Sequence, residues 1–146
     1  DSVKYCQKEK GLLVGAWSIM TSHVHLALGT NGENKLEDII RDLKSYTSRH
    51  IRKYMEINPS ESRREWMLGM MKKAGEAKSN NNDFQFWQQH NHPIELSTNQ
   101  IMMQRIDYIH NNPVEAGFVE NPSDWVFSSA RDYEDIQGLI EIHFLY

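Results

Sequence analysis

Two histidines separated by one residue, His23 and His25, stand in a mostly apolar stretch over residues 19–28. On a β-strand, side chains alternate between faces, so both histidines would point to one side and Val24 to the other. Two imidazoles held side by side on a rigid element can bind one divalent metal ion. A structural or surface role fits this short pattern equally well, so the pair alone leaves both interpretations open.

A tyrosine and an asparagine one helical turn apart form a second candidate group. The sequence predicts a helix over residues 99–111, and its buried side is expected to contain Ile101, Met102, Ile106 and Ile109. Tyr108 and Asn112 are four residues apart and therefore project from the same face. Tyr108 lies about a quarter of a turn from the middle of the apolar stripe, at the border between core and solvent. A lone tyrosine at such a border usually serves packing, so a role in chemistry requires a partner.

A long helix predicted over residues 35–55 carries basic and hydroxyl side chains on one side. Its apolar positions are Leu36, Ile39, Ile40, Leu43, Thr47, Ile51 and Met55, and its opposite face carries Arg41, Lys44, Ser45, Ser48, Arg49 and Arg52. A solvated helix face is the simpler interpretation. The alternative is a surface that contacts phosphates through arginine and hydroxyl donors.

A second histidine pair, His90 and His92, lies in a polar stretch beside Pro93. No rigid strand is expected there to hold both rings. We therefore expect this pair to lie on the surface or to contact a substrate, and not to form a metal site.

The remaining elements are predicted from periodicity and from turn residues. We expect a helix over residues 2–10 ended by Gly11, then a hairpin of strands 12–20 and 24–28 joined by Thr21 and Ser22. Asn34 with Glu37 resembles a capping box for the long helix. The overall prediction is an α+β fold with a largely antiparallel sheet.

Further predictions concern the rest of the chain. Ser62 with Glu65 should cap a helix that runs to residue 78, with a core stripe of Trp66, Met67, Met70, Met71 and Ala74. Residues 79–83 should form a mobile polar loop, residues 84–88 and 138–142 strands, and residues 93–96 a short extended piece. Pro113 should end the helix that begins near residue 99, because it disfavours helical backbone before it.

The composition is that of an ordinary globular domain. The chain has 146 residues, 39% of them hydrophobic and 25% charged, which is enough for one domain with a real core. A single cysteine, Cys6, excludes an intramolecular disulfide and fits a reducing cytoplasm. No apolar run approaches the length of a membrane span. The net charge of −4 argues against a general nucleic-acid coat but allows a local basic surface.

The histidine pair, the tyrosine and asparagine on one helix face, and the basic helix together indicate phosphoryl transfer. Two imidazoles and one amide oxygen can hold a hard divalent ion and leave coordination positions open. The ion would polarise a phosphate oxygen, and the tyrosine oxygen would attack the phosphorus in line.

At these positions the sequence resembles the single-tyrosine HUH transposases, and among them the REP-associated tyrosine transposases. The resemblance lies in IMTSHVHL at residues 19–26 and in YIHNNPVEAG at residues 108–117. Weaker similarity occurs at residues 43–48, 86–88 and 125–133. Where many relatives have Pro-Asn before the histidine pair, this chain has Thr21 and Ser22, which changes the turn and leaves the ligands in place.

The resemblance implies a ferredoxin-like sheet with helices packed on it, in one domain over residues 1–146 whose first strand would lie upstream of residue 1. It implies that Tyr108 cuts single-stranded DNA, forming a 5′-phosphotyrosine link and freeing a 3′-hydroxyl. His23, His25 and Asn112 would bind Mg²⁺ or Mn²⁺. The DNA would be a hairpin or palindromic repeat, contacted by the basic face at Arg41, Lys44, Ser48, Arg49 and Arg52. Insertion-sequence relatives are homodimers and REP-associated ones can be monomers, which leaves the oligomeric state open.

Other function classes compete with this interpretation. A non-catalytic protein that binds DNA hairpins on the same scaffold is the main alternative, since a retained fold need not retain chemistry. Other His-x-His enzymes do not fit: barrel hydrolases need a much longer chain, and histidine-triad hydrolases need a histidine where Ala27 stands. Cupins need a chain that is almost entirely strand, which the long helices contradict.

Overall fold

The computed structural model describes residues 1–77 and 84–145 and divides the chain into two compact units. The first unit consists mainly of Val3–Ile39 and the C-terminal part from Ile94, and the second consists mainly of Ile40–Pro93. The elements along the chain are α1 (Ser2–Lys10), β1 (Leu12–Ile19), β2 (Val24–Thr30), α2 (Leu36–Ile57), α3 (Arg64–Glu76), α4 (Asn99–Glu115) and the 3₁₀ helices η1 (Pro122–Asp124) and η2 (Ala130–Glu134). A single domain over residues 1–146 stays a prediction.

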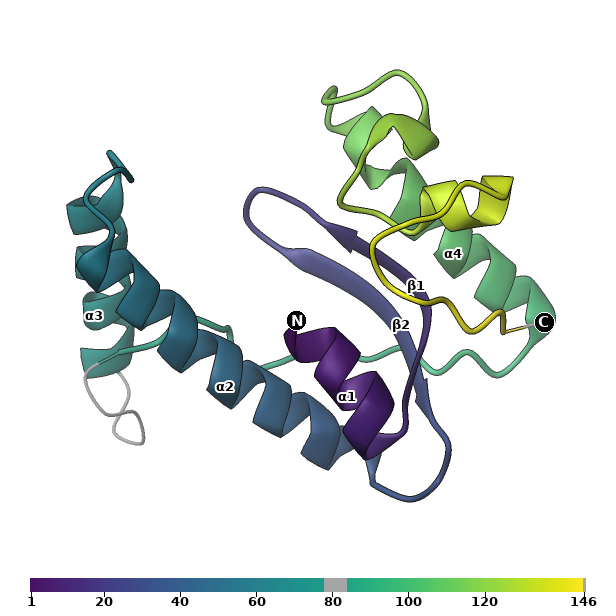
Figure 1. The fold of residues 1–146 in the computed structure, drawn as a ribbon, viewed down its shortest axis with the longest axis horizontal. Helices are drawn as coiled ribbons and strands as arrows, with labels where there is room; N and C mark the ends of the chain where they lie inside the picture. Colours follow the sequence, from purple (N-terminus) through teal and green to yellow (C-terminus); the bar gives the residue numbers. More distant parts are fainter. Residues whose placement is uncertain (78–83, 146) are drawn as a thin grey trace. The chain divides into compact units, whose positions relative to one another are not determined.

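The first unit is built on the β1–β2 hairpin (Figure 1). Helix α1 ends at Gly11, whose φ of 69° is left-handed and whose N–H donates to the Cys6 carbonyl. Glycine suits this cap because it adopts positive φ without strain. The strands pair antiparallel, with Ser18 opposite His25. The predicted first helix and hairpin are therefore confirmed.

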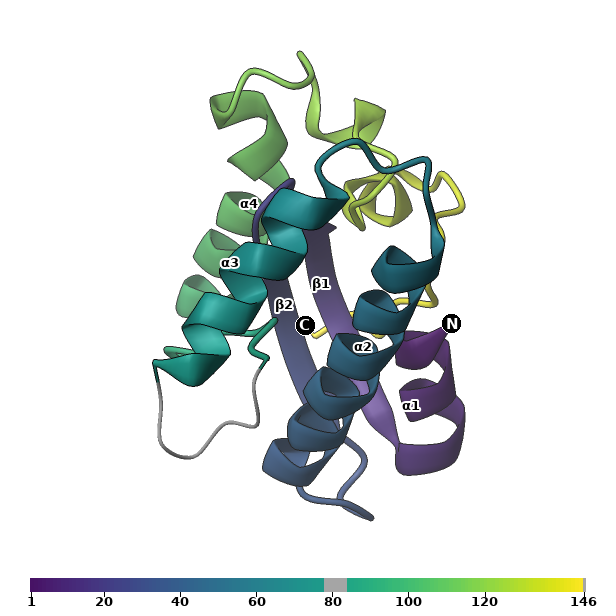
Figure 2. The ribbon, with the colours of Figure 1, turned by 90° about the vertical axis from the view of Figure 1, so that its left-hand side faces the viewer.

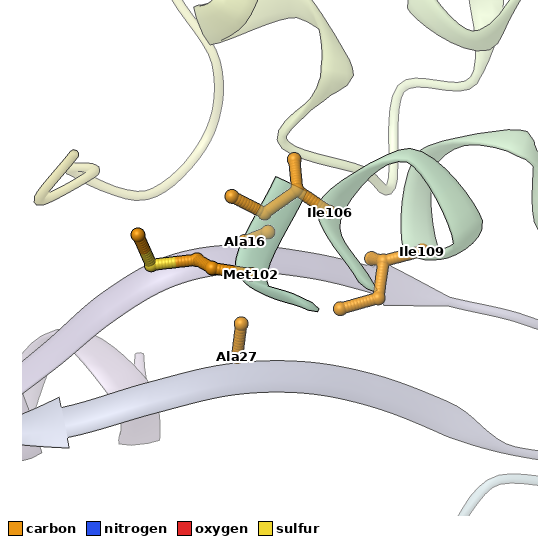
Figure 3. Packing of buried hydrophobic residues seen from close by; sticks show 5 residues of the cluster. All are labelled: Ala16, Ala27, Met102, Ile106 and Ile109. Carbon is orange, nitrogen blue, oxygen red and sulfur yellow. The ribbon is translucent and has the colours of Figure 1, made fainter. Parts of the chain in front are cut away.

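Helix α4 packs on the hairpin through a cluster of buried side chains. The cluster contains Ala16 of β1, Ala27 of β2 and Met102, Ile106 and Ile109 of α4 (Figure 3). The two alanines lack bulk, so the helix can lie close to both strands. Figure 2 shows α4 running alongside the hairpin.

The start of α4 is also confirmed. Its N-cap residue, Thr98, accepts a hydrogen bond from the Ile101 amide at 3.2 Å, as a threonine N-cap normally does. Ile101, expected to be buried, is only half-buried.

The predicted end of α4 is wrong, because the helix continues through Pro113 to Glu115. Pro113 is fully buried and lies in the last turn. Beyond it, the Phe118 N–H donates to the Pro113 carbonyl and the Gly117 N–H donates to the Val114 carbonyl, both at 2.9 Å. With Gly117 at a φ of 74°, these bonds form a Schellman motif. The glycine cap, and not the proline, therefore sets the end of the helix.

The C-terminal segment covers the edge of β1 that faces away from β2. The Ser129 N–H donates to the Trp17 carbonyl at 2.9 Å, and the His143 N–H donates to the Val14 carbonyl at 2.8 Å. The strand predicted over residues 138–142 is wrong, since these residues are irregular. One part of the free edge of β1 is hydrogen-bonded to the segment around Ser129. The C-terminal end of the chain contributes the bond from His143.

The first turn of helix α2 belongs to the first unit. The rest of α2 and all of α3 belong to the second unit. The long helix is confirmed, but the Asn34 side chain donates to the Lys10 carbonyl at 3.2 Å, which is not the predicted capping contact. Helix α3 has Arg63 at its N-cap position with no side-chain cap bond, so the Ser62 cap is wrong. The Arg63 backbone N–H donates instead to the side chain of Glu61, the residue before Ser62, at 3.0 Å.

The predicted core stripe of α3 is only partly buried, since Met67 and Met71 are half-buried and its other three members are exposed. Trp66 is 62% exposed and Met70 is 51% exposed, and Ala74 is exposed as well. Helical spacing identified one face of α3 but could not establish that another element covers it.

The segment after the gap in the described residues is irregular, so the strand predicted over residues 84–88 is wrong. It is held by specific bonds: the Gln85 N–H donates to the Met71 carbonyl, and the Trp87 indole N–H donates to Thr47 Oγ1, both at 2.9 Å. The loop predicted over residues 79–83 and the helix end predicted at residue 78 lie outside the described residues.

The fold class is α+β: four α-helices accompany one two-stranded antiparallel sheet in the described ranges. The ferredoxin-like arrangement stays a prediction. In residues 1–77 and 84–145, no helix combines the length and apolar character needed to cross a membrane.

Candidate active site

The histidine pair lies at the tip of the hairpin. The turn before β2 is closed by a hydrogen bond from the Met20 N–H to the His23 carbonyl at 2.8 Å, and His25 follows on β2. The two imidazole rings contact each other, with centroids 4.8 Å apart and planes at 83°. As strand alternation predicts, both rings are on one side of the hairpin.

Tyr108 of α4 lies beside this pair. Its ring centroid is 5.3 Å from that of His25, and its side chain is 45% exposed. His25 and Ala27 share one face of β2, so the helix that packs on Ala27 also reaches His25. Tyr108 is therefore anchored against the hairpin while part of its ring remains open to a substrate.

Asn112 completes the group one turn along α4. Its side-chain N–H donates to the Tyr108 carbonyl at 2.7 Å, which fixes the orientation of the amide. The Asn112 side chain also raises the pKa of His25, partly offsetting larger opposing effects. Since the side-chain N–H bonds to the Tyr108 carbonyl, Oδ1 is the acceptor atom of this amide that remains for a ligand.

The environment of His25 favours the neutral imidazole. Burial lowers its pKa, and the neighbouring His23 lowers it further. The Nε2 atom of His25 is buried and makes no hydrogen bond of standard geometry with the described part of the chain. A neutral imidazole with an unused lone pair is the form that binds a metal ion.

The contact between His23 and Ser22 is compatible with metal binding by His23. The Ser22 hydroxyl oxygen lies 3.1 Å from His23 Nδ1. When Nδ1 carries the proton and donates to Ser22, the lone pair of Nε2 is left for a ligand.

The donor atoms brought together are two imidazole nitrogens and one amide oxygen. Residues 1–77 and 84–145 hold no group of three or more His, Cys, Asp or Glu side chains that could bind a metal ion. The amide oxygen of Asn112 is a third donor atom on the same turn of α4 as Tyr108. The buried Nε2 of His25, which makes no hydrogen bond of standard geometry with a described residue, fits a metal site.

His110 is a residue that the sequence reasoning missed. It lies on α4 two residues after Tyr108, is 7% exposed, and has its Nε2 2.8 Å from Ser129 Oγ. Ser129 Oγ also accepts from the Trp17 N–H at 2.9 Å and donates to the Trp17 carbonyl at 3.3 Å. This buried network ties α4 to β1. Its sequence signal was a histidine one turn from the buried Ile106.

Lys44, one of the predicted DNA-contacting residues, is used within the second unit. Its ammonium donates to the Gln88 carbonyl at 2.7 Å and to Asn91 Oδ1 at 2.8 Å. Burial lowers its pKa. Lys44 therefore anchors the loop that contains His90 and His92, whose exposed rings lie 6.3 Å apart.

The other predicted DNA-contacting residues differ in their surroundings. Arg41 pairs with its neighbour Asp42 at 3.0 Å. Arg52 pairs with Glu56 at 2.8 Å and lies 4.7 Å from the Phe84 ring centroid. Ser48 is half-buried, and Arg49 is exposed with its Nε donating to the Ser45 carbonyl at 3.3 Å.

Comparison with known protein families identifies a match. The family model described as "Transposase IS200 like" matches residues 1–80, which is more than half of the chain. The matched range contains His23 and His25 and ends before Tyr108 and Asn112. No curated protein matches the chain, and no solved structure does.

Proposed function

The chain belongs to the IS200-like transposase family, and from this premise we propose that it cuts and rejoins single-stranded DNA through a covalent tyrosine intermediate. The family supports a DNA-processing transposase. The mechanism rests on one observation: the rings of His23, His25 and Tyr108 and the amide of Asn112 form a continuous group.

Tyr108 is proposed as the nucleophile. Its hydroxyl oxygen attacks the phosphorus of a DNA phosphodiester and loses its proton to solvent. The bond from phosphorus to the 3′ oxygen breaks, so the DNA retains a free 3′-hydroxyl once that oxygen takes up a proton. The 5′ phosphate is now linked to Tyr108. Attack by a 3′-hydroxyl from another strand reverses the step, so one phosphodiester bond is exchanged for another without an external energy source.

His23, His25 and Asn112 are proposed to hold Mg²⁺ or Mn²⁺. When bound, such an ion supplies charge stabilisation to a phosphate oxygen. The protein contributes two imidazoles whose rings contact each other, and the bond from Asn112 to the Tyr108 carbonyl couples this ligand to the helix turn of the nucleophile. Together these contacts orient Tyr108 relative to the ligands.

Finer assignments rest on the sequence motifs. The stretch from Tyr108 to Gly117 supports the REP-associated branch, and a DNA hairpin or palindromic repeat is the proposed substrate. The order of helix, hairpin and packed α4 is compatible with part of a ferredoxin-like fold.

The test is covalent capture of DNA. The protein is mixed with single-stranded hairpin DNA from its own genomic flanks, with Mg²⁺ or Mn²⁺ in one sample and chelator in the other. Denaturing gels and mass spectrometry then look for a DNA adduct on the Tyr108 peptide. We expect a metal-dependent adduct in the wild type and none in Tyr108→Phe, which keeps the ring and removes the nucleophilic oxygen.

Binding of the same DNA separates the two function classes. Tyr108→Phe should bind the hairpin nearly as well as the wild type, because the ring contact with His25 remains. Tight binding by the wild type with no adduct on several flanking hairpins would instead assign the chain to non-catalytic DNA binding.

A further inference from the structure

One exposed face of α2 combines aromatic rings with positive charge. Tyr46, His50 and Tyr54 are four residues apart, and Arg49 and Lys53 lie between them at helical spacing. Tyr46 is 46% exposed and Tyr54 is 62% exposed, and the other three side chains are exposed as well. We call these five residues the aromatic face of α2.

The rings of Tyr46 and His50 are held in place. Their centroids are 3.7 Å apart with planes at 23°, so the rings are stacked. His50 Nδ1 lies 2.9 Å from the Tyr46 carbonyl, which can only accept, so this nitrogen carries the proton and donates. A ring pair fixed in this way loses little further entropy when a flat ligand stacks on it.

The charge on this part of the helix has one sign. From Leu43 to Met55 the sequence contains four Lys or Arg residues and no Asp or Glu. Two of the four, Lys44 and Arg52, make contacts within the second unit. Arg49 and Lys53 remain beside the exposed rings. A second copy of this chain would bring the same cations to the contact, so a strand of negative charge fits the face better.

We propose that the aromatic face of α2 binds unpaired DNA, with bases stacked on Tyr46 and Tyr54 and phosphates contacted by Arg49 and Lys53. Interleaved rings and cations are the combination that binds single strands, because bases stack on the rings and the cations track the backbone. The inference extends the proposed function by giving the unpaired part of the substrate its own surface. That surface differs from the basic face predicted from the sequence and shares only Arg49 with it.

The test measures DNA affinity without cleavage. The full chain is titrated in chelator into two labelled DNAs, an unpaired oligothymidylate and a blunt hairpin without unpaired flanks, and fluorescence anisotropy is recorded. Tyr46→Ala and Tyr54→Ala should each weaken binding of the unpaired DNA by about 5-fold or more, the range of a lost base stack. Binding of the blunt hairpin should change by less than about 2-fold.

Matched variants separate stacking from general damage. Tyr54→Phe keeps the ring and should bind like the wild type. Trp66→Ala removes a ring that is also 62% exposed, but on α3, and should leave binding unchanged. Lys53→Ala should reduce the slope of log affinity against log salt by about 0.7, the value for one lost contact to a single strand, whereas Lys73→Ala on α3 should not.

Several outcomes would overturn the inference. These are unchanged affinity of either tyrosine variant, equal weakening for paired and unpaired DNA, or a change in oligomeric state by light scattering, which would make the face a self-association surface. The proposed function fails separately: binding through the aromatic face with no Tyr108 adduct would refute the cleavage reaction alone. An adduct with normal binding by Tyr46→Ala would refute this inference alone.

Discussion

Ser129→Ala should destabilise the first unit by roughly 2–6 kcal/mol, because its hydroxyl serves several buried partners at once. Ser129 is fully buried, and its Oγ accepts from the Trp17 N–H at 2.9 Å and lies 2.8 Å from His110 Nε2. Alanine would leave both buried groups without a partner. Each such loss costs about 1–3 kcal/mol, and the 3.3 Å bond to the Trp17 carbonyl adds little.

The assay is urea unfolding followed by far-UV circular dichroism and tryptophan fluorescence, with the free energy obtained by linear extrapolation. Ser62→Ala is the matched control, since this serine is exposed and does not cap α3. It should change the free energy of unfolding by less than about 0.5 kcal/mol, whereas a true N-cap would cost about 1 kcal/mol.

A double-mutant cycle with His110→Leu tests the network itself. The coupling energy between the two positions should be about 1 kcal/mol or more, because the residues share one hydrogen bond in a buried site. The view that this network holds α4 against β1 would be refuted if Ser129→Ala lowered the free energy of unfolding by less than about 1 kcal/mol. Additive effects of the two substitutions on this free energy would refute it as well.

Three further predictions follow from single groups. Removing one of three proposed ligands in His25→Ala should weaken Mn²⁺ affinity at least about tenfold, measured by calorimetry; unchanged affinity would contradict the ligand assignment. Burial holds the pKa of His110 below its ordinary value, so below about pH 6.5 the unfolded chain takes up a proton that the folded chain excludes. The free energy of unfolding should therefore fall as the pH falls below this value, with a smaller slope in His110→Gln; equal slopes in urea titrations would argue against it. Gly117→Ala meets no neighbour within 4 Å but keeps a φ of 74°, and should cost roughly 1 kcal/mol. Gly11→Ala should cost more, because its Cβ would also collide with the Asn31 side chain; similar unfolding midpoints for both would contradict this ranking.

Local patterns were sufficient for α1, the hairpin and the start of α4. Gly11 and Thr98 act on groups within a few residues, so their effects can be recognised in the sequence. The same holds within each half of the candidate site. Strand pleating places His23 and His25 on one side, and helix pitch places Tyr108 and Asn112 on one face.

Local rules failed where a distant contact or a competing local signal prevailed. Pro113 did not end α4, because the Schellman motif at Gly117 satisfies the last carbonyls. The apolar run over residues 138–142 did not become a strand. Helical spacing also gave no sign that the Lys44 ammonium would donate to the Gln88 carbonyl and to Asn91 Oδ1, which lie more than forty residues further along the chain.

The sequence by itself identified the candidate side chains and determined which of them share a local face. Only the tertiary structure brought the two halves together, because α4 can reach His25 only by packing on Ala16 and Ala27. The bond that accompanies this packing joins His110 to Ser129, which lie nineteen residues apart. The spacing of residues along the sequence does not predict which buried donor will bond to which buried acceptor. The pairing depends on how whole helices and strands pack against one another.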